Sequence, residues 1–152
     1  MEVETKYDGI IKISESDVIT FEDGIPGFED AKKFVVVIHK DSMIQILQSI
    51  EDSNIALPVV NIMEMDVNYN VNISGSIVDK LGIKDNTSIK VLNVLSIREH
   101  FEDSTVNLLA PVVINADNMK AKQIISDNNN YGVRHPILDF IKTIGSKSRR
   151  CI

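Results

Sequence analysis

The strongest constraint on the fold is a stretch of alternating residues from Ser104 to Asn115. Every second residue in it is apolar, which predicts a β-strand with one fully apolar face and one mixed face. Pro111 lies within the stretch, and proline has no N–H to donate to a ladder. The sequence therefore predicts an edge strand, or a strand broken by a bulge at Pro111. Pro111 is then either a tolerated edge proline or part of a surface held open for a partner.

Further short apolar runs recur about every ten residues along the chain, bounded by polar turn residues. Phe34–Ile38 is β-branched and continuous, so we predict a central strand with Met43–Ile50 as its hairpin partner. Pro58 is expected to limit the strand Ile55–Ile62 to an edge or a bulge. The other predicted strands are Ile10–Ile13, Val18–Phe21, Val67–Ile73, Thr87–Ile97 and Met119–Ser126.

Two segments change to a helical period. Ser74–Gly82 places its apolar residues on one face, with serine able to cap the start and Gly82 able to end the helix. Ile137–Gly145 follows His135 and Pro136 and reads as a second short helix. With eight to ten short strands, the predicted fold is mainly β: a small antiparallel β-barrel-like domain with one short inserted helix and a C-terminal helix. We expect this domain to span residues 1–145 and residues 146–152 to form a basic, mobile tail.

The chain is acidic, and its charge is unevenly placed. It holds 16 basic and 22 acidic residues, a net charge of −6. Lys142–Ile152 contains four bases and no acid, so residues 1–141 hold 12 bases and 22 acids, a net charge of −10. An acidic body disfavours nucleic acid as a direct ligand and favours a basic protein partner. The alternative is that the charge only maintains solubility.

The residues expected of a catalytic or metal site are missing from the sequence. Cys151 is the one cysteine and lies next to the C-terminus, and the three histidines have no ligand spacing. The charged cluster Glu99–Asp103 is better read as a solvated turn than as a metal site. We therefore predict no catalytic residues, no metal and no cofactor. The charged N-terminus is not a signal peptide, and no apolar run is long enough to cross a membrane.

One further motif lies in the N-terminal third, at Phe21–Phe28. Its two glycines and one proline exclude a regular element. Ile25 and Phe28 are nevertheless too apolar for a plain solvent loop. A tight turn that places these side chains on the core explains both facts, and contact with a partner is the alternative.

These motifs together resemble the family of the flagellar assembly factor FliW. The resemblance runs in consistent order from Thr5 to Pro136 and is most specific at Gly24–Phe28 and Asn107–Asn115. Ala121 departs from the family, which usually has glycine before Lys-Gln. The other segments that carry the resemblance are Thr5–Gly9, Leu47–Ser49, Lys122–Gln123 and Tyr131–Pro136.

The resemblance implies a cytoplasmic bacterial β-barrel-like protein without enzymatic activity. It implies two partners: flagellin, and the basic RNA-binding regulator CsrA, which represses flagellin translation. Such a protein would release CsrA repression once flagellin is exported, and so act by exchanging partners. As partner-binding residues we predict Ile25, Phe28, Asn107, Leu109 and Pro111. A small-barrel nucleic-acid-binding protein and a small enzyme with a barrel pocket are the alternatives.

Overall fold

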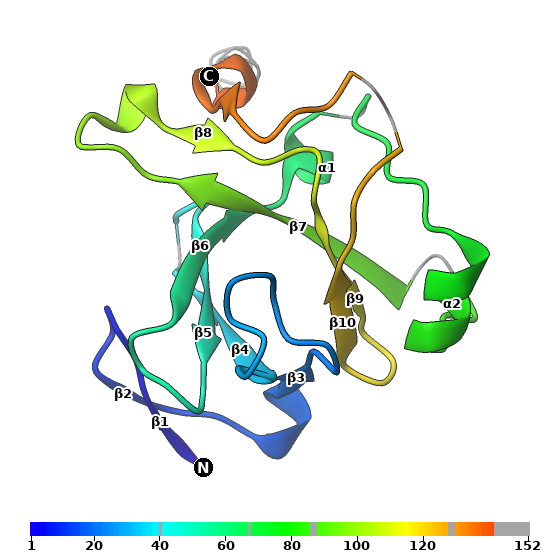
Figure 1. Cartoon of the computed structure of the whole chain (residues 1–152). Coiled ribbons are helices and arrows are strands. Elements are labelled where there is room, and N and C mark those ends of the chain that lie inside the picture. The colour runs from blue at the N-terminus through cyan, green and yellow to red at the C-terminus, as the bar shows by residue number, and fades with distance from the viewer. Residues whose placement is uncertain (40, 67, 86–87, 128–129, 142–152) are drawn as a thin grey trace.

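Seven strands of the described chain close into a β-barrel. The computed structural model describes residues 1–141 except 40, 67, 86–87 and 128–129. In ring order the strands are β7 (Ile89–Ser96), β6 (Ala56–Val60), β5 (Gln45–Ser49), β4 (Lys33–Ile38), β3 (Ile19–Thr20), β10 (Lys120–Gln123) and β9 (Val112–Asn115). Pairing of β9 with β7 closes the ring (Figure 1). All neighbours are antiparallel except β3 and β10. The predicted mainly β, barrel-like fold is confirmed.

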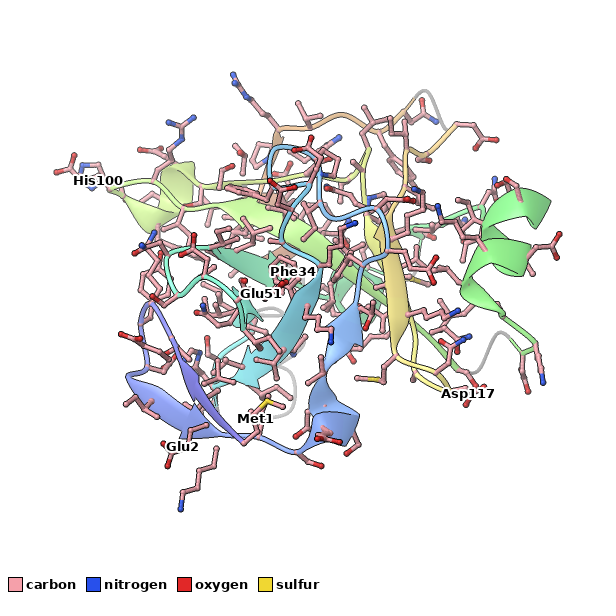
Figure 2. The ribbon with its side chains drawn as sticks, turned by 60° about the horizontal axis from the view of Figure 1, so that its bottom comes forward. Met1, Glu2, Phe34, Glu51, His100 and Asp117 are labelled. Atoms are coloured by element: carbon pink, nitrogen blue, oxygen red, sulfur yellow. The ribbon has the colours of Figure 1, made fainter. Side chains whose placement is uncertain are left out.

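Four short strands and several short helices decorate the barrel. β1 (Glu2–Glu4) and β2 (Ile10–Lys12) form a separate hairpin, while β8 (Thr105–Val106) and β11 (His135–Pro136) extend the sheet beyond β7. The helices include α1 (Ile62–Met65), α2 (Gly75–Leu81), the 3₁₀ turns Glu15–Asp17 and Phe101–Asp103, and a helical segment at 138–141. In Figure 2 the hairpin that joins β7 to β8, with His100 at its tip, stands out from the barrel body.

The barrel interior is one of two apolar cores. Phe21 and Phe34 meet inside it edge to face, with ring centroids 5.2 Å apart. The second core lies on the outer side of β6, β7 and β9, where α1, α2 and the C-terminal segment cover it. Strand β7 serves both cores, because Leu92 faces the interior while Val91 and Leu95 face outward. This explains why the sequence of β7 is apolar on both faces.

The stretch Ser104–Asn115 is not one continuous strand. It divides into β8 and β9, and the five residues between them, 107–111, belong to no strand. Asn107 Oδ1 accepts the N–H of Ala110 at 2.9 Å, a local bond that replaces the ladder. β9 itself lies between β10 and β7, so the prediction of an edge strand is wrong. The predicted break is present, but it is wider than a single bulge at Pro111.

Val67–Ile73, predicted as a strand, contains none among its described residues 68–73. Tyr69 is buried in the second core, and Val71 and Ile73 pack against it. The backbone N–H of Asn70 donates to the Tyr131 hydroxyl at 3.0 Å rather than to a neighbouring strand. The alternation of apolar and polar residues in Val67–Ile73 therefore reflects an extended segment that covers the second core without pairing with a strand.

The helix predictions agree with the described residues. Ser74 Oγ accepts the N–H of Ile77 at the start of α2, and Gly82 ends the helix with φ +65°. The second predicted helix is present at 138–141, where Phe140 is buried. Residues 142–145 and the predicted tail 146–152 lie outside the described residues. Ala121 pairs with Ile114 in regular strand β10, so this position does not need glycine.

Candidate partner-binding surface

The turn at Ile25–Phe28 separates two apolar side chains that the sequence analysis grouped together. The Phe28 N–H donates to the Ile25 carbonyl oxygen at 2.7 Å, and Gly27 has φ +91°, as a type II turn requires at this position. Ile25 is 2% exposed and packs in the barrel interior. Phe28 is 40% exposed and points away from that core. The turn therefore places the Ile25 side chain in the barrel interior and leaves the Phe28 side chain on the surface.

Two carboxylates follow the exposed aromatic ring in the chain. Glu29 accepts backbone hydrogen bonds from its own N–H and from the Gly27 N–H, and both lower its pKa. Asp30 is exposed. Neither carboxylate forms an ion pair with another described residue. We call Phe28, Glu29 and Asp30 the Phe28 patch; its chemistry suits an apolar group bordered by positive charge.

The acidic residues on the other side of the turn are neutralised. Asp23 pairs with Lys80 of α2 and with Lys122 of β10, the latter at 2.7 Å. Lys120 lies 3.4 Å from Glu22. These pairs attach the turn to the barrel wall and to α2, so they position the Phe28 patch rather than contribute to its free charge.

The ion pairs of Asp23 predict how the stability of the fold changes with pH. Hydrogen bonds from Lys122 and Lys80 lower the Asp23 pKa from 3.8 to about 2. A carboxyl group whose pKa is lower in the folded than in the unfolded state stabilises the fold at any pH above its unfolded-state pKa. This stabilisation is lost as the pH falls through the folded-state pKa. We therefore expect Asp23→Asn to be less stable than the wild type at pH 7, with the difference shrinking between about pH 4 and pH 2.

Urea unfolding at several pH values measures this difference. Asp30→Asn is the matched control, because Asp30 has no ion pair with a described residue. A gap between Asp23→Asn and the wild type that stays constant from pH 7 to pH 2 would refute the assignment.

The remaining predicted partner-binding residues lie in the β8–β9 connection. Asn107 supports the fold: its N–H donates to the Val94 carbonyl at 2.9 Å, and its carbonyl accepts from the Asn93 side chain at 3.0 Å. Pro111 is buried, while Leu109 is half-buried. Ile25 and Pro111 therefore cannot contact a partner directly in this conformation. Of the five residues, Phe28 is the best placed for contact, and Leu109 is partly accessible.

Sequence reasoning missed Glu29 and Asp30, although both directly follow the Gly-Ile-Pro-Gly-Phe motif. The sequence does not show which of Ile25 and Phe28 is exposed. Only the structure, in which Ile25 is buried and Phe28 is exposed, places the two carboxylates directly after an exposed aromatic residue. Among the described residues, no group of three His, Cys, Asp or Glu side chains could hold a metal ion. None of the described helices is long and apolar enough to cross a membrane.

A small closed barrel with an apolar interior, which carries an exposed aromatic side chain on a tight turn, places the chain among the small β-barrel proteins. Comparison with known proteins identifies the group: the family model described as FliW protein matches residues 2–137. This chain belongs to the FliW family. The family is one of flagellar assembly factors, which are regulatory proteins and not enzymes.

Individual relatives agree over most of the chain. The flagellar assembly factor FliW of Thermosipho africanus is 43% identical over 134 residues, covering 87% of this chain and 92% of the relative. The FliW of Bacillus subtilis is 39% identical over 138 residues, covering 90% and 96%. A crystal structure of the flagellar assembly factor FliW superimposes with a TM-score of 0.83 at 32% identity, covering 90% of this chain and 96% of that one.

Proposed function

We propose that this protein works in the cytoplasm as a partner switch that binds flagellin and the regulator CsrA. While flagellin is abundant it occupies the protein; when flagellin is exported, the freed protein binds CsrA and relieves repression of flagellin translation. Membership of a family of flagellar assembly factors supports the role in flagellar assembly. The choice of these two partners follows from the motifs that carry the resemblance.

The observation that carries the CsrA part is the Phe28 patch. Phe28 is an aromatic side chain that the core leaves 40% exposed, beside two carboxylates that form no ion pair with described residues. A basic partner gains both apolar burial and charge complementarity there. The same negative field would repel an RNA backbone from the complex.

We expect Phe28→Ala to weaken CsrA binding about ten-fold or more, since aromatic anchors dominate interface energies. The change should leave the melting temperature close to that of the wild type, because the ring is not in the core. Isothermal titration of the purified protein with CsrA measures the affinity. Ile125→Ala is the matched control, because Ile125 is an apolar side chain that is 79% exposed elsewhere on the surface.

Two further outcomes decide the proposal. Glu29→Gln with Asp30→Asn should reduce the salt dependence of CsrA binding, because exposed complementary charges are screened by salt. If the wild-type protein fails to bind either CsrA or flagellin at micromolar concentration, the partner switch is wrong. If Phe28→Ala binds CsrA as tightly as Ile125→Ala does, the patch is not the CsrA surface.

A further inference from the structure

An apolar groove lies on the barrel wall, away from the Phe28 turn in sequence. Its volume is about 580 Å³, and it is lined by four apolar residues and one aromatic residue: Ile46, Pro58, Leu95, Ile97 and Tyr7. Ile46 and Leu95 are almost fully buried, whereas Tyr7 is 57% and Ile97 is 50% exposed. We call these five residues the seam groove. The β1–β2 and β7–β8 hairpins stand on the same side of the molecule in Figures 1 and 2.

The groove lies where the ladder between β6 and β7 stops. These strands share two residue pairs, Val59 with Val94 and Val60 with Asn93, and the register ends at Pro58. Continuing it would place Pro58 opposite Leu95, where proline has no N–H to give. Beyond this point β7 pairs with β8 on the edge that faces away from β6, and β6 pairs with β5 on the edge that faces away from β7. The facing edges of β6 and β7 therefore form no further ladder.

The wall formed by Tyr7 is held in place by bonds on both sides. The Lys6 N–H donates to the buried Gln48 Oε1 at 3.0 Å, and Asp8 pairs with His39 at 2.6 Å. The Lys6 ammonium lies 5.4 Å from the centroid of the Tyr7 ring. A wall held in this way loses little freedom when a ligand enters the groove.

We propose that the seam groove binds an extended segment of flagellin by strand addition. The inference rests on the proposed function, because it takes flagellin from there. An interrupted ladder offers backbone groups that an added strand can pair with. The apolar floor accepts alternate side chains of such a strand, and Tyr7 and Ile97 close over them.

Charge separates flagellin from CsrA as the occupant. Each exposed wall residue is followed or preceded by a base, Lys6 beside Tyr7 and Arg98 beside Ile97. The carboxylate of Asp8 is already paired with His39. A basic partner would meet like charge at both walls, which disfavours CsrA here.

The test compares Ile97→Asp with Ile125→Asp, since both replace an exposed isoleucine with a carboxylate. We expect Ile97→Asp to weaken flagellin binding about ten-fold or more, because it places a charge in an apolar groove. Ile125→Asp should change it less than about two-fold. Both variants should bind CsrA as the wild type does. Tyr7→Ser, on the opposite wall, repeats the test if Ile97→Asp lowers the melting temperature.

Amide hydrogen exchange distinguishes strand addition from a contact made by side chains alone. With flagellin bound, the amides of Leu95 and Ile97 should exchange more slowly. If wild-type protein fails to bind flagellin, the proposed function falls. If the wild-type protein binds flagellin, but Ile97→Asp and Tyr7→Ser both bind it as tightly as the wild type does, the seam groove is not the flagellin site. Weakened binding without slower exchange overturns strand addition.

Discussion

Replacing Gly24 with alanine is expected to lower the free energy of unfolding by about 3 kcal/mol or more. Gly24 has φ +67°, a region that an L side chain adopts at a cost. A Cβ at this position would also lie 2.3 Å from the backbone carbonyl oxygen of Glu29. Because the obstacle is backbone, it cannot move aside without opening the whole turn. The melting temperature should fall by about 10 °C.

Gly27→Ala is the matched control in the same turn. Gly27 also has a positive φ, +91°, but an added Cβ there would meet no atom within 4 Å. It should therefore lose only the conformational part, about 1 kcal/mol. Thermal and urea unfolding of the two variants measure the difference. Equal losses would show that the close approach to Glu29 does not matter.

The comparison also assigns the roles of the motif residues. If Gly24 is required by the fold, then the motif serves first to place Ile25 inside the barrel and Phe28 outside it. Binding of CsrA by Gly27→Ala, measured below its melting temperature, should then stay close to wild type. The partner surface would depend on Phe28 and the two carboxylates rather than on the glycines.

Local patterns in the sequence were sufficient for the barrel and for α2. The capping serine and terminal glycine of α2 are local, and so are the β-branched runs of β4 and β7. Val67–Ile73 misled, because a period of two reports burial on one side and does not reveal whether a neighbouring strand exists. Ser104–Asn115 misled for the same reason: β8 pairs with β7 and β11, β9 pairs with β7 and β10, and the residues between them belong to no strand.

The candidate sites depended on contacts that no local pattern reveals. Ile25 and Phe28 look equivalent in sequence, and only packing against the barrel interior separates them. The seam groove gathers residues from Tyr7 to Ile97 that are spread over most of the chain. Pro58 was the one residue whose type pointed to the groove. The sequence predicted that it limits its strand to an edge or a bulge, whereas in the structure the ladder between β6 and β7 ends at Pro58 within the closed barrel.

Gln48→Leu is expected to lower the free energy of unfolding by about 3 kcal/mol, because it leaves several backbone groups without partners. Gln48 is fully buried in β5. Its Nε2 donates to the Ser49 and Ser53 carbonyls at 3.0 and 3.2 Å. Its Oε1 accepts the Lys6 N–H at 3.0 Å. Leucine fills a similar volume but can make none of these bonds.

Gln45→Leu, three residues earlier in the same strand, should leave the free energy of unfolding unchanged or raise it slightly. Gln45 Oε1 is buried and has no hydrogen-bond partner among the described residues. Removing an unsatisfied polar atom is neutral or stabilises the fold by up to about 1 kcal/mol. Urea unfolding of both variants measures the contrast. Because Gln48 also anchors Lys6, amide exchange at Lys6 should be faster in Gln48→Leu and unchanged in Gln45→Leu. If the two variants lose the same stability, buried hydrogen bonding at Gln48 is not what fixes the β1–β2 hairpin to the barrel.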